Sequence, residues 1–352
     1  MKEKFVLVTG SAGLIGFESV EFFINKGFTV IGIDNNFRKY FFGKNGSVYK
    51  NIFFLKKNKK YIHFNIDLRN CNKVKNIFKK YKSNIKIIIH SAAQPSHDWA
   101  TKNPLLDFDI NARVTLNLLE LFKKYSPKSS FIFMSTNKVY GNSINKFSFI
   151  EKKKRFELNK NSPFYYKGVN ENLSIDNSLH SLFGASKLSS DIYVQEYGKN
   201  FKLNTVAFRG GCLTGKNQSG AELHGFLSYL VKNVMKTKSY KIIGYKGKQV
   251  RDNIHSHDLV NCFWNYYKNP KKGAVYNIGG GRKNSCSILE AIEIIERKLC
   301  IKVKKKFIKK NRAGDHKWWI TDYSKFKKDY PKWKIKISIN MIIEELIKSN
   351  LK

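Results

Sequence analysis

The fold is decided by the stretch from Lys4 to Gly16, K-F-V-L-V-T-G-S-A-G-L-I-G. A short apolar run, suited to a buried strand, leads into glycines spaced G-x-x-G-x-x-G at the start of a helical pattern. Glycines between a strand and a helix allow a tight turn, close approach of the backbone to a pyrophosphate, and close helix packing. The free N–H groups at the helix N-terminus then face the phosphates. The stretch therefore predicts a dinucleotide-binding βαβ unit.

The next residues complete this unit. Leu14 to Lys26 carries apolar residues at helical spacing, Gly27 suits the helix C-terminus, and Phe28 to Asp34 predicts a second buried strand. At the end of that strand, the Asp34 carboxylate can accept hydrogen bonds from both ribose hydroxyls and repels a 2′-phosphate. This favours NAD over NADP, and the nearby Arg38 weakens the preference.

Further apolar runs predict more strands, and helical patterns lie between them. We expect strands at 62–66, 85–90, 131–135, 205–209 and 275–278, and helices at 111–124 and 182–197. Strands that alternate with helices predict an α/β fold, a Rossmann-like, doubly wound parallel sheet covered on both faces.

The second half of the chain has a weaker alternation, and no linker separates it from the first. We expect residues 1–212 to form the NAD-binding domain, with a strand near 275–280 returning to it. Residues 213–352 should mainly form a smaller, interleaved substrate-binding lobe, with substrate in the cleft between the two. Residues 37–60 are an aromatic and basic insertion that we expect to be a long loop, of the kind that is usually functional or mobile.

Composition sets the class of protein. The 352 residues are 42% hydrophobic and 14% aromatic, which suits a large core and excludes a disordered chain. No apolar run approaches the roughly 20 residues that span a bilayer, and the N-terminal run is too short for a signal peptide. The five cysteines show no metal-site spacing. We therefore expect a soluble, cytoplasmic protein without a metal.

The charge is strongly positive. Lysine and arginine number 66 against 26 acidic residues, a formal charge of +40, which raises the hypothesis of a nucleic-acid binder. Only nine of the 66 are arginine, the residue best suited to base edges and bidentate phosphate contacts, and the lysines are spread along the chain. We favour a solvated basic surface that also attracts an anionic substrate.

Later segments resemble one enzyme family, the extended short-chain dehydrogenase/reductases that act as NAD-dependent sugar-nucleotide epimerases and dehydratases. The segments are H-S-A-A at 90–93, S-T-N-K-V-Y-G at 135–141, F-G-A-S-K at 183–187, G-K-Q-V-R-D at 247–252, Y-N-I-G-G at 276–280 and R-x-x-D at 312–315. Within the family they are most similar to the CDP-paratose 2-epimerase group. The resemblance implies a nucleotide-sugar substrate, no nucleic-acid or membrane partner, and a homodimer as the candidate assembly.

The resemblance also implies a catalytic set, from which one member is missing. The family's base is a tyrosine in a Y-x-x-x-K pair, and an assisting Ser or Thr ends a strand. Lys187 matches the lysine and Thr136 the assisting hydroxyl, but Phe183 stands at the tyrosine position. A phenyl ring can neither accept nor donate a proton, and loss of a general acid–base group costs about 10²- to 10⁴-fold in rate.

Three interpretations stay open. Epimerisation can persist with another base, for which the candidates are Tyr165, Tyr166, His180 and Lys187 itself. The chain can instead run a different reaction on a nucleotide sugar, such as dehydration or reduction. It can also bind NAD or nucleic acid without catalysis, and steep loss of affinity with rising salt would identify a nucleic-acid binder.

The remaining candidates contact cofactor or substrate by the same resemblance. Asp67, after the third strand, suits an adenine contact or a helix N-cap, while His97 and Asp98 either face the sugar or begin a helix. The implied cofactor-binding residues are Gly10, Ala12, Gly13, Leu14, Ile15, Gly16, Asp34, Asn35, Arg38, Asp67, Leu68, Ser91, Ala92, Ala93, Asn111, Ser135 and Lys187. The implied substrate-binding residues are Asn137, Lys138, His224, Arg251 and Arg312, the two arginines holding the diphosphate.

Overall fold

The computed structural model describes residues 3–218, 225–309 and 315–351. The chain forms two compact units, each assembled from separate segments. The first unit comprises residues up to 139, 182–209 and 260–276, and the second comprises 140–181, 210–259 and 277–352. The assignment of NAD binding to residues 1–212 and of substrate binding mainly to 213–352 stays a prediction.

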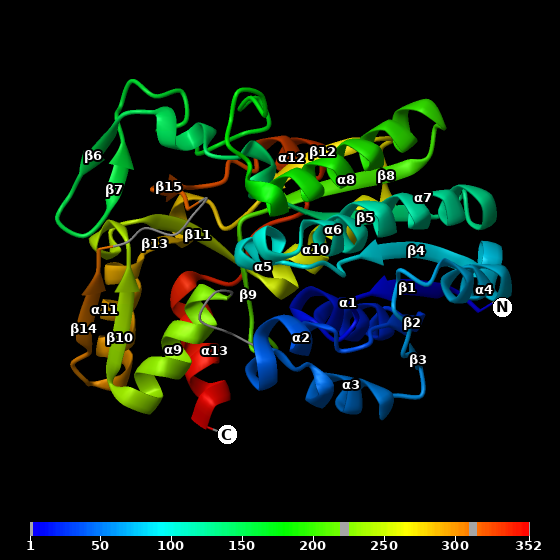
Figure 1. Cartoon of the computed structure of the whole chain (residues 1–352), viewed down its shortest axis with the longest axis horizontal. Coiled ribbons are helices and arrows are strands. Elements are labelled where there is room, and N and C mark those ends of the chain that lie inside the picture. The colour runs from blue at the N-terminus through cyan, green and yellow to red at the C-terminus, as the bar shows by residue number, and fades with distance from the viewer. Residues whose placement is uncertain (1–2, 219–224, 310–314, 352) are drawn as a thin grey trace. The chain divides into compact units, whose positions relative to one another are not determined.

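A seven-stranded sheet carries the fold (Figure 1), in the order β12-β8-β5-β4-β1-β2-β3. The β1–β2, β1–β4, β2–β3 and β4–β5 pairs are parallel. All seven strands lie where the apolar runs predict them, which confirms the Rossmann-like α/β fold. Their bounds are β1 Phe5–Thr9, β2 Thr29–Ile33, β3 Tyr61–Phe64, β4 Ile85–His90, β5 Ser130–Thr136, β8 Asn204–Gly210 and β12 Ala274–Ile278.

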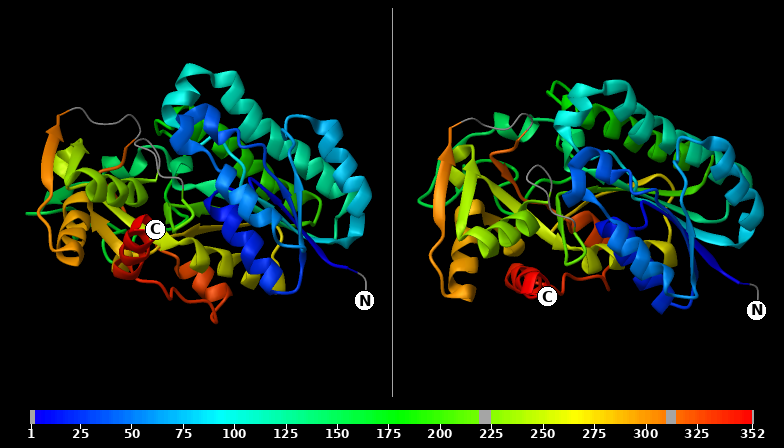
Figure 2. Two further views of the ribbon diagram at one scale, coloured as in Figure 1. Left: turned by 90° about the horizontal axis from the view of Figure 1, so that it is seen from below. Right: turned by 60° about the horizontal axis from the view of Figure 1, so that its bottom comes forward.

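Helices cover both faces of this sheet, and Figure 2 shows α1 on the side away from α7 and α8. On one face, buried residues of α4, α7 and α8 form a core with strand residues such as Leu7, Ile88 and Phe131. On the other, Phe23 of α1 contacts Trp264 of α10, with 6.2 Å between ring centroids. The helices are α1 Leu14–Asn25, α4 Cys71–Tyr81, α5 His97–Lys102, α6 Pro104–Phe108, α7 Val114–Tyr125, α8 Ser181–Asn200 and α10 Ser256–Lys268.

The expected long loop at residues 37–60 is wrong, because this segment is largely helical. It forms α2 (Arg38–Phe42) and α3 (Tyr49–Lys56). Val48 and Ile52 are buried against Ala12, and the Asn51 side chain donates to the Ala12 carbonyl oxygen at 2.9 Å. The apolar residues of the segment thus have helical spacing and brace the glycine turn.

The second unit combines small sheets with helices. A four-stranded sheet joins β9, β11, β13 and β15, and β10 pairs with β14. Buried residues of α9, α11 and α13 form one apolar core. The bounds are β6 Phe149–Glu151, β7 Phe156–Leu158, β9 Cys212–Thr214, α9 Phe226–Thr237, β10 Ser239–Ile243, β11 Val250–His255, β13 Ser285–Ser287, α11 Ile288–Leu299, β14 Lys304–Ile308, β15 Trp318–Trp319, α12 Ser324–Asp329 and α13 Ile339–Leu351.

Within the described residues, no helix combines the length and apolar character needed to cross a bilayer. The five cysteines are free thiols. In the same ranges, no cluster of three or more His, Cys, Asp or Glu side chains is arranged to hold a metal ion.

Candidate active site

The glycine turn between β1 and α1 has the geometry of a dinucleotide-binding loop. Gly10 has a φ of +66°, and a Cβ added there would lie 2.8 Å from the backbone of Ala92 at the end of β4. A Cβ on Gly16 would lie 2.0 Å from the Gly10 carbonyl oxygen, so only glycine lets α1 approach the strand this closely. Gly13 is the N-cap of α1 and offers no side chain to cap its first turn. The backbone N–H groups in the first turn of α1 therefore have no side-chain cap and suit a pyrophosphate, so the loop fits NAD.

Asp34 follows β2 and is hydrogen-bonded to this turn. One carboxylate oxygen accepts from the Ala12 N–H at 3.0 Å, and the other accepts from the Asn36 N–H at 2.8 Å. Burial raises the pKa of Asp34, and the two backbone hydrogen bonds oppose that shift. Arg38 lies over the Phe42 ring, 4.6 Å from its centroid, and burial lowers its pKa to about 10.

The end of β4 is tied to the turn through small and neutral groups. The Ser91 hydroxyl donates to the Thr9 carbonyl oxygen at 2.8 Å. His90 hydrogen-bonds through its two ring nitrogens to the hydroxyls of Thr9 (2.7 Å) and Thr115 (3.0 Å). Burial lowers the pKa of His90 to about 3, so its imidazole is neutral at physiological pH and serves the architecture.

Lys187 projects from α8 toward β5. Its Nζ donates to the Met134 carbonyl oxygen at 2.8 Å and lies 4.1 Å from the centroid of the Phe133 ring. Burial lowers the pKa of Lys187 to about 7, against the opposing charges of Asp191 and Asp107. The ammonium form is therefore costly here, and the neutral amine is accessible near pH 7.

Phe183 lies one helical turn before Lys187 and is buried. The imidazole of His97 meets its ring nearly edge-on, with 5.0 Å between centroids and an interplanar angle of 67°. His97 is the first residue of α5, and the Ser96 hydroxyl caps this helix by accepting from the Trp99 N–H at 3.3 Å. The sequence left two roles open for His97, and the structure gives it the helix start together with a contact to the missing-tyrosine position.

Comparison with known families decides the assignment. Residues 6–279 match the NAD dependent epimerase/dehydratase family. The chain belongs to this family. NAD is therefore its cofactor, in agreement with the glycine turn and Asp34.

Two curated relatives extend the comparison. The chain is 32% identical over 300 residues to CDP-paratose 2-epimerase of Salmonella typhi, covering 83% of each chain. It is 30% identical over 336 residues to UDP-glucuronate 4-epimerase of Thermodesulfobacterium geofontis, covering 95% of this chain and 92% of that one.

One solved structure that is similar to this chain is also that of a sugar-nucleotide epimerase. It is a tyrosine-to-phenylalanine mutant of UDP-glucuronic acid 4-epimerase from Bacillus cereus, in complex with a fluorinated UDP-glucuronic acid and NAD. Its TM-score is 0.79 at 26% identity, with 99% of both chains covered.

The family's other expected cofactor residues occupy varied surroundings in the first unit. Asn111 is buried, where its amide donates to Gln94, Asp107 and Ser186 and so joins the segment after β4 to α8. The Ser135 hydroxyl donates to the Asp191 carboxylate.

Asp67 is paired with Arg69 at 2.7 Å, which lowers the pKa of Asp67. The alternative role of Asp67 as a helix N-cap is wrong, because the Asn70 side chain caps α4.

The remaining cofactor candidates lie at the carboxyl ends of β1, β2, β3 and β4 or in the turns that follow. The Asn35 side chain accepts from the Phe37 N–H at 3.1 Å, and the partly buried Leu68 packs against the hydrophobic core that includes α4 and α7. Their contacts to a cofactor stay predictions, as do those of Leu14, Ile15, Ala92 and Ala93.

The substrate-side candidates are spread over both units. After β5, the Thr136 hydroxyl accepts from the Lys138 N–H at 3.2 Å, and Asn137 is buried between them in sequence. In the second unit, Arg251 donates to the Asp315 carboxylate and to the His316 carbonyl oxygen (2.6 Å), so its charge is partly balanced. His224 and Arg312 lie outside the described residues.

Sequence reasoning missed two carboxylates close to Lys187. Asp191 is fully buried one turn further along α8, and its oxygens pair with Arg209 at 2.8 Å. Asp107 accepts from the Gln94 side chain at 2.7 Å. The i, i+4 spacing of Lys187 and Asp191 on a helix was the available signal for the first, and nothing local marks the second.

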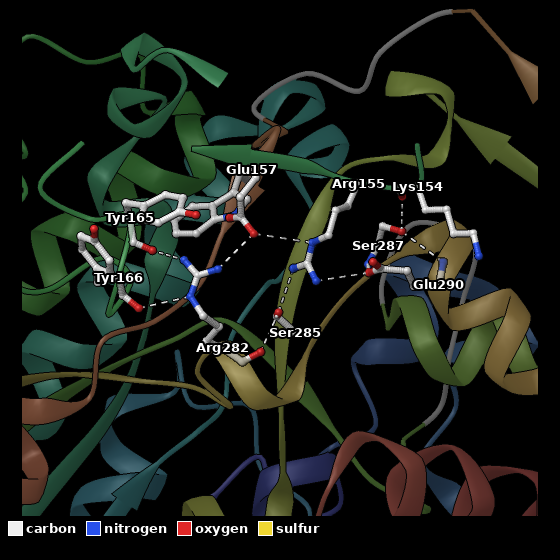
Figure 3. Close-up of polar contacts among 10 residues, drawn as sticks. Lys154, Arg155, Glu157, Tyr165, Tyr166, Arg282, Ser285, Ser287 and Glu290 are labelled. Carbon is white, nitrogen blue, oxygen red and sulfur yellow. Dashed lines mark hydrogen bonds and ion pairs between the residues drawn. The ribbon is translucent and has the colours of Figure 1, made fainter. Parts of the chain in front are cut away.

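A polar cluster in the second unit was also missed (Figure 3). Arg282 donates to the Glu157 carboxylate at 3.0 Å and to the carbonyl oxygens of Tyr165 and Tyr166. Arg155 donates to the Ser285 hydroxyl at 2.9 Å and lies 3.5 Å from Glu290. The cluster fixes the backbone of both tyrosines that the sequence offered as replacement bases.

Proposed function

We propose that this protein is an NAD-dependent epimerase of a nucleotide-activated sugar, with a CDP-linked hexose as the favoured substrate. The 32% identity to CDP-paratose 2-epimerase, over 83% of both chains, carries the choice of reaction and nucleotide. The glycine turn, Asp34 and the buried Lys187 support it, because they are the groups that a hydride-transfer epimerase needs around its cofactor.

The chain's residues divide the work of binding. The N–H groups at the start of α1 hold the cofactor pyrophosphate, and Asp34 accepts hydrogen bonds from a ribose. Lys187 holds the nicotinamide ribose and supplies positive charge at the end of β5. When bound, NAD supplies an acceptor for the hydride of a sugar C–H bond. Thr136 orients the sugar hydroxyl, and Arg251 with Arg312 binds the diphosphate through charge-assisted hydrogen bonds.

Dehydration is the second reaction in this family, and product mass separates it from epimerisation. The purified protein is analysed by mass spectrometry for retained NAD and then incubated with CDP-paratose, UDP-glucuronic acid and dTDP-glucose. We expect bound NAD and a product isomeric with its substrate, most strongly from CDP-paratose. A product lighter by one water indicates a dehydratase, and absence of NAD together with no conversion of any of the three contradicts the proposal.

A further inference from the structure

One ring contact bears directly on the missing tyrosine. His97 and Phe183 belong to the same compact unit and come from different elements, α5 and α8. Their rings touch nearly edge-on, with 5.0 Å between centroids. Phe183 is only 7% exposed, whereas His97 is half-buried. A titratable side chain therefore lies beside the one position from which the usual proton acceptor is absent.

Imidazole suits the missing role. Transient oxidation of a sugar alcohol needs a side chain that takes the hydroxyl proton and later returns it. Histidine has an ordinary pKa of about 6.5, so it exchanges a proton near neutral pH more readily than tyrosine, at about 10. Unlike tyrosine, histidine needs no lysine partner to bring its pKa into this range.

Three of the four bases named from the sequence make other contacts in the structure. Lys187 Nζ donates to the Met134 carbonyl oxygen and lies against the Phe133 ring, and the proposed function assigns this amine to the nicotinamide ribose. The Tyr165 ring packs under the Arg282 guanidinium at 5.4 Å, within the cluster of Figure 3. His180 pairs through Nε2 with the Ile175 carbonyl oxygen at 2.7 Å.

We propose that His97 is the catalytic acid–base residue that replaces the missing tyrosine, an inference that rests on the proposed epimerase function. In the oxidation half-reaction, the O–H and C–H bonds of one sugar carbon break and a C=O bond forms. The hydride, with the C–H electron pair, goes to NAD, and the proton goes to a ring nitrogen of His97. The reduction half-reaction returns the hydride to the opposite face of the carbon and the proton to the oxygen, so the cycle leaves NAD oxidised and His97 neutral.

The first test compares His97→Gln and His97→Ala with wild type, with CDP-paratose as probe. Both variants should lose about 10²- to 10⁴-fold in turnover, and added imidazole should restore part of the activity of His97→Ala. Lys102→Gln, at the exposed end of the same helix, is the matched control and should keep wild-type turnover. Full activity in His97→Gln overturns the proposal.

A second variant keeps the test decisive if loss of His97 harms folding. In His97→Gln, the added change Phe183→Tyr places a phenol one turn from Lys187 and should recover at least about 10-fold in turnover, because it restores the usual pair. A double variant no more active than His97→Gln, while both retain NAD and wild-type melting temperature, contradicts the proposal. If wild type converts no nucleotide sugar, the proposed function itself fails; if wild type is active and His97→Gln equally so, only the role of His97 fails.

An NMR measurement that needs no substrate tests the contact between His97 and Phe183. In NMR spectra of ¹³C-histidine-labelled protein, the ring signals of His97 are those lost in His97→Gln. Phe183→Leu removes the phenyl ring current and should shift these signals, while the buried His90 signals stay in place. Unchanged His97 signals in Phe183→Leu contradict the ring contact on which the proposal stands.

Discussion

Lys187 donates a hydrogen bond from its buried Nζ to the carbonyl oxygen of Met134, at 2.8 Å. The amine thus ends beside the last residues of β5. Its surroundings combine an aromatic face, Phe133, with the more distant charges of Asp107 and Asp191. Burial outweighs those charges, so this lysine holds its proton far less firmly than an exposed one.

Lys187 should therefore make stability depend on pH. Its pKa is about 7 in the folded protein, against an ordinary 10.5, so the unfolded chain binds more protons between these values. The free energy of unfolding then rises with pH across this window, and the cost of burying the charge is complete below about pH 7. Lys187→Met should be more stable than wild type at about pH 7, by on the order of 2–4 kcal/mol, and lose this advantage toward pH 10.

Urea denaturation of both proteins at the two ends of this window measures the effect, because groups common to both cancel in the difference. A difference in unfolding free energy that does not change with pH would show that Lys187 keeps an ordinary pKa.

Phe183→Tyr in the otherwise wild-type chain should leave turnover flat or lower. The buried phenyl ring of Phe183 packs against His97, so an added hydroxyl is unpaired or competes for the substrate proton. Steady-state turnover of CDP-paratose checks this. A large gain would mean that the chemistry is the family's usual one, merely impaired by the phenylalanine.

Asp34→Ala should weaken NAD binding by roughly 1–3 kcal/mol, since a charged hydrogen-bond acceptor is lost. Wild type should also bind NAD more tightly than NADP, because the carboxylate repels a 2′-phosphate. Calorimetry with both nucleotides measures the two differences, and Asp109→Ala, which removes an exposed i, i+4 ion pair, is the control. Equal or tighter binding of NADP by wild type would refute the assignment of Asp34 to the ribose.

Arg251→Ala should raise the KM for CDP-paratose by roughly 10- to 100-fold with little change in kcat, because the lost hydrogen bonds hold the diphosphate in ground and transition state alike. Lys59→Ala removes one positive charge at a position far from Arg251 in the sequence and should change neither KM nor kcat. Similar, negligible effects of both substitutions on KM would contradict a defined diphosphate site at Arg251 and would leave only general attraction by the basic surface. Arg251 also pairs with Asp315, so its loss can disturb the structure. The variant Arg251→Lys, which keeps the charge, and the melting temperature of each variant are the controls for this effect.

The sheet could be predicted strand by strand because its strands are continuous apolar runs. A strand such as Ile85–His90 is buried on both faces, so its apolar composition alone predicts that it is buried. The glycine turn was equally predictable, since a Cβ added at Gly16 or Gly10 would lie 2.0 or 2.8 Å from neighbouring backbone atoms, where no side chain fits. These are local constraints, and local sequence records them.

The segment at 37–60 was missed for the opposite reason. Its charged and aromatic residues suggest a loop, whereas in the structure the segment is largely helical and two of its apolar residues, Val48 and Ile52, pack on the distant Ala12. The contact of His97 with Phe183 joins residues that are 86 positions apart and lie on different helices. No spacing rule reports such a pair, so the candidate bases named from sequence omitted the histidine that the fold brings to the site.

Epimerisation in deuterated water tests most directly whether the sugar hydrogen moves as a hydride. The NAD-loaded protein is incubated with CDP-paratose in D₂O, and the product is analysed by NMR and mass spectrometry. Because the hydrogen at the inverted carbon leaves and returns as hydride, we predict an isomer of the substrate with no deuterium at that carbon. Deuterium at the inverted carbon, or no isomer from a protein that retains NAD, would contradict NAD-dependent epimerisation.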